Sequence, residues 1–250
     1  MTDLDHLRVV LVATRNPLNI GAAARAMSNF GVRRLRVVNP YEAAFREARS
    51  AVGAAGLLAK AEQYENVAVA VADCKLVVGT TAATRRELQH RLLRLDVGAR
   101  TIKRQLQTGP VALLFGSERY GLSNQELSHC HWLMRIPTRE EHGSMNLGQA
   151  VAVCLYELVR GQKTAPAKTK TALGKKQKTS ATSREVERLT QLLFKVLSAS
   201  GYVNPRAAAA EEKLRRLVRR MELNASDTEV WLGMLRQMAW KLGASAKDAK

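Results

Sequence analysis

Acidic residues, cysteines and aromatic side chains are all scarce in this chain of 250 residues. The three cysteines are an odd number at wide spacing, which excludes a disulfide framework and favours a reducing compartment. No run approaches the ~20 consecutive apolar residues that a membrane span needs. Residues 1–5 lack the basic and then apolar pattern of a signal peptide. We therefore expect a cytoplasmic protein with no membrane partner.

The shortage of acidic residues leaves a strong positive balance. Lysine and arginine number 40 against 22 aspartates and glutamates, for a formal net charge of +18. Residues 160–250 hold 20 of the basic side chains but only 8 of the acidic ones, so this part carries most of the excess. Such a surface attracts polyanions, and a phosphate backbone is the partner it favours. A soluble protein that is merely basic remains the alternative.

Short apolar runs alternate with amphipathic stretches through the first 160 residues. The apolar runs predict strands at 7–12, 35–38, 76–78, 111–115 and 133–136. Helical spacing predicts helices at 21–30, 42–60 with a break near Gly53, 67–74, 123–130 and 146–160. This alternation is typical of an α/β domain with a mainly parallel sheet, which we assign to residues 1–161.

A change of composition follows that domain. Residues 162–182 are rich in lysine and almost free of large apolar side chains, so they cannot bury enough surface to offset the entropy of ordering them. We interpret them as a flexible linker, either a plain tether or one that also touches nucleic-acid phosphates. Residues 183–250 return to helical spacing and predict a small all-α extension of three helices. Pro205 is expected to start the second helix, and Ser226 to cap the third.

Several common chemistries find no support in the sequence. Neither a G-x-G-x-x-G after the first strand nor a P-loop is present, which disfavours a conventional dinucleotide or ATP site. The run His129-Cys130-His131 is a poor metal-ligand set, because adjacent side chains point in different directions and no second ligand pair follows. We therefore expect no metal.

Three segments rich in glycine, asparagine, serine and arginine follow predicted strands. They read N-P-L-N-I-G-A-A-A-R at 16–25, L-L-F-G-S-E-R-Y-G-L-S at 113–123, and I-P at 136–137 followed by G-S-M-N-L-G at 143–148. In open α/β sheets, ligands bind at the carboxyl ends of the strands, so these segments are well placed to form one site. Taken singly, each of them also fits an ordinary turn or strand–loop–helix connection.

In this order, the three segments resemble the SPOUT-class RNA methyltransferases of the SpoU/TrmH branch, and the helical tail resembles the TrmJ group within it. The resemblance implies a SPOUT fold with a C-terminal trefoil knot that binds S-adenosylmethionine, and a homodimer. It also implies methyl transfer to a ribose 2′-hydroxyl of tRNA, on cytidine or uridine at nucleotide 32 of the anticodon loop. A ribosomal RNA methyltransferase of the same family and a catalytically silent RNA-binding protein on the same fold remain alternatives.

Matched positions imply roles for individual residues. The catalytic group would comprise Arg25, Asn19, Ser144 and Asn146. The cofactor group would comprise Thr80, Thr81, Ala82, Gly116, Glu118, Ile136, Ser144 and Met145. A guanidinium keeps its proton at neutral pH, so we expect Arg25 to orient the ribose and stabilise oxyanion charge rather than to act as a base. One departure is Gly143, where TrmJ relatives have serine, which puts one cofactor hydrogen bond in doubt.

Clusters of arginine predict where RNA binds. The candidates are Arg85 and Arg86 after the third strand, and Arg215, Arg216 and Arg219 on the second tail helix. The spacing of the last three puts them on one broad helix face, which would dock on phosphates. A solvated charged face with no binding role is the alternative.

Overall fold

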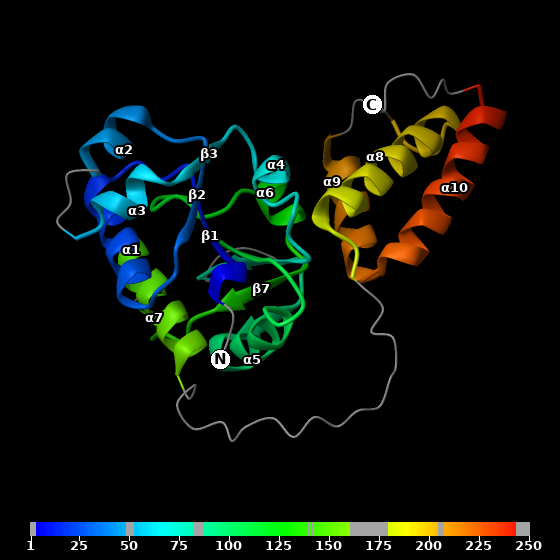
Figure 1. The fold of residues 1–250 in the computed structure, drawn as a ribbon. Helices are drawn as coiled ribbons and strands as arrows, with labels where there is room; N and C mark the ends of the chain where they lie inside the picture. Colours follow the sequence, from blue (N-terminus) through cyan, green and yellow to red (C-terminus); the bar gives the residue numbers. More distant parts are fainter. Residues whose placement is uncertain are drawn as a thin grey trace, which may run out of the picture.

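The computed structural model describes residues 4–48, 53–82, 88–139, 141, 143–160, 180–204 and 208–243. An α/β domain occupies the part up to residue 160, and three helices follow from residue 180 onward, beside one face of that domain (Figure 1). Among the described residues, no helix is long and apolar enough to cross a membrane.

A seven-stranded parallel sheet forms the centre of the α/β domain. Its strands are β1 (Leu7–Val12), β2 (Arg34–Val38), β3 (Glu62–Tyr64), β4 (Leu76–Thr80), β5 (Leu92–Arg94), β6 (Val111–Phe115) and β7 (Trp132–Arg135). They run in the order β3-β2-β1-β6-β4-β7-β5. Every residue of β1 and β6 is buried, as expected for parallel strands covered on both faces. This order places the carboxyl ends of β1, β6, β4 and β7 in succession.

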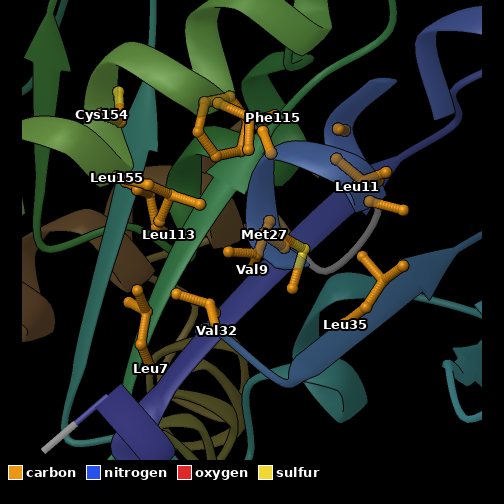
Figure 2. Close-up of a cluster of buried hydrophobic side chains, with 14 of the residues drawn as sticks. Leu7, Val9, Leu11, Met27, Val32, Leu35, Leu113, Phe115, Cys154 and Leu155 are labelled. Carbon is orange, nitrogen blue, oxygen red and sulfur yellow. The ribbon is translucent and has the colours of Figure 1, made fainter. Parts of the chain in front are cut away.

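Helices cover both faces of the sheet. They are α1 (Pro17–Asn29), α2 (Glu42–Ala48), α3 (Ala55–Ala59), α4 (Val67–Ala70), α5 (Leu95–Gln105), α6 (Asn124–Ser128) and α7 (Leu147–Val159), after a short 3-10 helix at Leu4–His6. Leu7, Val9 and Leu11 point into the larger core, with side chains from α1 and α7 (Figure 2). Val10 and Val12 point into the other core, beneath α4 and α6. The alternation along β1 thus divides the apolar residues between two layers.

A glycine allows the close packing of α1 on α7. A Cβ added at Gly148 would lie only 2.5 Å from the Cβ of Ala22, so any larger residue would push the two helices apart. The N-terminus of α1 is capped by the side chain of Asn16, with Pro17 in the first turn. These local features begin the helix directly after the β1 loop.

The tail consists of α8 (Ser183–Ala199), α9 (Ala208–Arg220) and α10 (Ala225–Lys241), with α9 and α10 both packed on α8 around a small core of their own. The backbone amides of Ser183 and Arg184 donate to the carbonyls of Cys74 and Ala72, at 2.8 and 3.0 Å. The start of α8 is therefore hydrogen-bonded to the turn that follows α4. Figure 1 shows α9 beside α6, and α10 on the far side of the tail.

Some sequence predictions need correction. The edge strands β3 and β5 have three residues each and too short a pattern to predict, and helix α5 is absent from the predicted helices. The predicted helix at 67–74 ends at Ala70. The cap of α10 is Asn224, whose side chain accepts from the Asp227 amide, so the expected cap at Ser226 is wrong. Described structure already begins at Ser180, within the expected linker, and Thr182 caps α8. Pro205 lies outside the described residues.

Candidate active site

The three sequence segments meet at one edge of the sheet. The first follows β1 and opens α1, the second follows β6 and leads to α6, and the third follows β7 and leads to α7. Because β1, β6, β4 and β7 are consecutive and parallel, their following loops emerge side by side. This is the edge at which open α/β sheets bind their ligands.

A chain of side-chain hydrogen bonds joins the three segments. The Nδ2 of Asn19 donates to the carboxylate of Glu118 at 3.1 Å. The Nδ2 of Asn146 donates to the Oδ1 of Asn19 at 2.7 Å. The Oδ1 of Asn146 also accepts from the backbone amides of Gly148 and Gln149, which makes Asn146 the cap of α7. Both predicted catalytic asparagines are therefore held in defined orientations.

Glu118 holds the β1–α1 loop. Besides Asn19, its carboxylate accepts from the backbone amides of Arg15 and Asn16 at 3.4 and 3.3 Å. The family resemblance implies a cofactor contact for Glu118, whereas its carboxylate is directed toward this loop. A contact between Glu118 and a cofactor stays a prediction.

Arg25 lies on the exposed side of α1, one and a half turns beyond Asn19. Its guanidinium passes close to Gly53, where an added Cβ would lie 3.2 Å from Nη1. Gly53 has a φ of +80°, a backbone conformation that favours glycine. From the sequence, Gly53 is predicted only to break a helix. Its proximity to Arg25 arises from the fold and had no signal in the sequence beyond the glycine itself.

The ends of β4, β6 and β7 are tied together by the residues predicted to bind a cofactor. The hydroxyl of Thr80 donates to the carbonyl of Leu114 at 2.8 Å, and the backbone amide of Thr81 donates to the carbonyl of Met134 at 3.0 Å. Ala82 and Ile136 continue from these strand ends and are half-buried. Uncharged hydroxyl, amide and apolar groups therefore surround this part of the site.

Gly116 permits a tight return of the chain after β6. A Cβ at this position would lie 2.1 Å from the carbonyl carbon of Gly121, because Ser117 and Gly121 pair as an antiparallel bridge. The loop before α7 is also braced, since the Thr138 hydroxyl donates to the Gly143 carbonyl at 3.3 Å. Ser144 is exposed in this loop and Met145 is half-buried. Both residues lie in the loop, before α7 begins at Leu147.

The predicted RNA-binding arginines of α9 lie mostly inside the protein. Arg215 and Arg219 are 6% and 2% exposed, and both pair with Glu187 of α8, at 2.9 and 3.6 Å. Arg215 also donates to the hydroxyl of Ser128 on α6. The prediction that Arg215 and Arg219 lie on an exposed, phosphate-binding face is therefore wrong. Their charges instead join the tail helices to each other and to α6.

Arg216 is half-buried and pairs with Glu212 at 3.5 Å, whereas Arg85 and Arg86 lie outside the described residues. The spacing correctly put the α9 arginines near one another, but spacing does not say whether a face points to water or to a neighbouring element. Glu187 of α8, which pairs with both arginines, and Glu211 of α9, which pairs with Arg215, make the inward arrangement favourable.

The histidines near this junction stay neutral. Burial and the neighbouring Arg219 and Arg215 lower the pKa of His129 to about 2. Burial also lowers the pKa of His131 to about 3, and its Nδ1 accepts a hydrogen bond from the Val77 amide. Among the described residues, no group of three or more histidine, cysteine or acidic side chains is arranged to hold a metal.

Comparisons with known proteins cover both the site and the tail. The model of the SpoU rRNA Methylase family matches residues 6–156. A tRNA (cytidine/uridine-2′-O-)-methyltransferase TrmJ of Sodalis glossinidius is 35% identical over 234 residues, which are 93% of this chain and 91% of the relative. The corresponding Yersinia pestis protein is 36% identical over 239 residues. The crystal structure of TrmJ from Z. mobilis ZM4 matches with a TM-score of 0.78 and 31% identity, over 92% of this chain and 98% of that one.

Proposed function

The chain belongs to the SpoU rRNA methylase family, and we propose that it is an S-adenosylmethionine-dependent tRNA methyltransferase acting on the ribose 2′-hydroxyl of cytidine or uridine. The observation that carries this proposal is the hydrogen-bonded chain Glu118–Asn19–Asn146, which joins the three family segments and includes the first turn of α1, the helix that carries Arg25. Similarity to proteins named as tRNA methyltransferases extends through the tail and favours tRNA over ribosomal RNA. Within tRNA we propose nucleotide 32 of the anticodon loop as the position of the methyl group, and the support for it is the resemblance to the TrmJ group.

The predicted cofactor residues fit S-adenosylmethionine chemically. They offer hydroxyl groups at Thr80, Thr81 and Ser144, backbone groups at Gly116, and apolar side chains at Ile136 and Met145. None of them is a cation, so the positively charged sulfonium of the cofactor meets no repulsion from this set. When bound, the cofactor supplies an already activated methyl group.

Residues of this chain would then align the ribose. Arg25 can bind the ribose and the adjacent phosphate and stabilise oxyanion charge on the 2′-oxygen as it is methylated. Because the guanidinium keeps its proton, the hydroxyl proton leaves to phosphate or water. The Asn19–Asn146 hydrogen bond holds the start of α1, the helix that carries Arg25, against the start of α7, and the exposed hydroxyl of Ser144 can hydrogen-bond the ribose.

We further infer that the protein is a cytoplasmic homodimer whose C-terminal segment of the α/β domain forms a trefoil knot. The resemblance to the SPOUT class is the support for the knot and the dimer. The positive charge of the whole chain supports an RNA partner. Arg85 and Arg86 stay our candidates for contacts with its phosphates.

The test is an in vitro reaction of purified protein, S-adenosylmethionine and unmodified tRNA transcripts, mapped by nuclease digestion and mass spectrometry. We expect a 2′-O-methyl group at nucleotide 32 that is lost with Arg25→Ala, while Arg25→Lys retains a small part of the activity. Equal activity of Arg25→Ala under single turnover would remove Arg25 from the mechanism. Methylation of ribosomal RNA fragments alone would reassign the substrate, and absence of cofactor binding would favour a silent RNA-binding protein.

A further inference from the structure

Helix α10 carries an apolar strip that nothing in the described part of the chain covers. Val230, Met234 and Met238 are 60%, 42% and 49% exposed, and Trp231 and Leu242 extend the strip along the helix. The opposite side of α10, with Leu232, Leu235 and Ala239, is buried against α8. In Figure 1, α10 is the helix farthest from the α/β domain. Large exposed apolar side chains gathered on one helix face are typical of an interaction surface.

The strip is symmetric about Met234. Val230 and Met238 lie four residues before and after it, and Asp227 and Lys241 lie seven residues before and after it. At 3.6 residues per turn, all four positions are within about 40° of the direction of Met234. A two-fold axis through Met234 would therefore place Val230 of one helix on Met238 of the other, and Asp227 of one beside Lys241 of the other.

From this pattern we propose that α10 packs antiparallel on the α10 helix of a second copy of this chain, with Met234 at the two-fold axis. The charges select both the partner and the direction. An antiparallel pair brings two Asp227–Lys241 pairs together, whereas a parallel pair would oppose like charges at both ends of the strip. Antiparallel packing also sets each positive helix N-terminus beside a negative C-terminus. A nucleic acid fits the strip less well, because Asp227 would repel phosphate.

Cysteine cross-linking tests the proposal on the full chain. The three native cysteines are buried, with pKa values raised to about 12 by burial, so they stay unreactive under mild oxidation. Met234→Cys should form an intermolecular disulfide at least about tenfold faster than the control Trp240→Cys, because a disulfide requires close Cβ atoms. Trp240 is a matched control, since it is exposed on the same helix but points away from the strip.

A second pair of variants tests the direction of packing. Asp227→Cys and Lys241→Cys should form few disulfides alone but a mixed disulfide when combined. Equal rates for Met234→Cys and Trp240→Cys would overturn the proposal, and fast homodisulfides of Asp227→Cys would overturn the antiparallel arrangement. If the Met234→Cys rate stays at the control level while Met234→Glu weakens tRNA binding, the strip is an RNA surface and the proposal fails. All of these side chains are exposed, so circular dichroism should show an unchanged fold.

A charge exchange gives an independent readout. In the Met234→Cys protein, Asp227→Lys should lower the rate of intermolecular disulfide formation several-fold. The double exchange Asp227→Lys/Lys241→Asp should restore that rate. Asp227→Lys alone places a charge that is unfavourable to the helix dipole at one end of α10, and the double variant does so at both ends. Recovery in the double variant therefore arises only from pairing between two copies, and failure to recover would count against the proposed register.

Discussion

The side-chain amide of Asn146 donates a 2.7 Å hydrogen bond to the side-chain oxygen of Asn19, so the residue that caps α7 also orients a side chain in the first turn of α1. These two residues are 127 positions apart in sequence. Glu118 binds the other end of the Asn19 amide, which leaves this side chain with one favourable orientation. The loops after β1, β6 and β7 are thereby coupled through one small polar side chain.

This coupling predicts non-additive effects on catalysis. Asn19→Ala and Asn146→Ala should each lower kcat/KM by roughly tenfold or more, and the double variant should lose less than the product of the two, since they break one shared hydrogen bond. Steady-state kinetics with tRNA transcripts would measure kcat/KM for the unsubstituted protein, the two single variants and the double variant. Asn66→Ala is the control, because Asn66 caps α4 away from the site and should affect stability by about 1 kcal/mol but not kcat/KM. Strict additivity of the site pair would contradict the coupling.

Glu118 should act through position rather than through folding stability. Glu118→Gln replaces a carboxylate that accepts from Asn19 and two backbone amides with a group that has only one acceptor oxygen. We expect kcat/KM to fall by about tenfold, with little change in the melting temperature because Glu118 is exposed. Glu126→Gln provides the comparison, since Glu126 belongs to the capping box of α6. If both variants lose activity equally, the assignment to Glu118 fails.

The close approach of α1 and α7 predicts a steric effect at one glycine. Gly148→Ala should destabilise the protein by about 1–3 kcal/mol, because its methyl group would meet Ala22 at 2.5 Å. Gly233→Ala in α10 meets nothing within 4 Å and should stabilise its helix by up to about 1 kcal/mol. Denaturant unfolding of the two variants measures both effects. An unchanged unfolding free energy in Gly148→Ala would show that α1 and α7 can move apart at no energetic cost.

The half-buried Glu187 should stabilise the packing of α9 on α8 within the tail. Glu187→Gln removes the carboxylate that Arg215 and Arg219 share; Arg215 keeps Glu211, but the buried charge of Arg219 loses this partner, and the expected loss is about 3–5 kcal/mol. Glu212→Gln breaks a pair with the less buried Arg216 and should cost no more than about 1 kcal/mol. Urea unfolding followed by tryptophan fluorescence suits this comparison, because Trp231 and Trp240 are in the tail. Similar losses of unfolding free energy for the two variants would contradict the larger contribution assigned to Glu187.

Stability should fall as the pH falls below about 6.5. Burial, with Arg216 and Arg220 nearby, lowers the pKa of His90 to about 4, and His129 and His131 are lowered further. Between pH 6.5 and 4 the unfolded chain takes up protons that the folded chain excludes, so each histidine adds a slope of up to about 1.4 kcal/mol per pH unit. Unfolding free energies measured between pH 7 and 5 should show this slope, and it should diminish in His131→Asn. An unfolding free energy that does not change between pH 7 and 5 would show that these histidines are not buried in the neutral form.

Apolar runs and turn residues were sufficient to predict most of the α/β domain. The runs at β1 and β6 are buried on both faces, as predicted, whereas α1 begins at Pro17 after the Asn16 cap, earlier than the predicted start at residue 21. Edge strands such as β3 have only three residues and gain their conformation from pairing with a neighbour. Short segments of this kind carry too little periodicity to be recognised alone.

The α/β class, the helical tail and the three segments that form the site follow from the sequence alone, because they depend on residue type and short-range spacing. Only the packing of the whole chain brings distant residues together: Asn146 with Asn19, Glu118 with the β1–α1 loop, and the backbone at Gly53 with Arg25. It also decided that Arg215 and Arg219 point inward while Met234 points outward. A helical pattern shows which residues share a face, but the elements packed against that face determine whether it is buried or exposed to solvent.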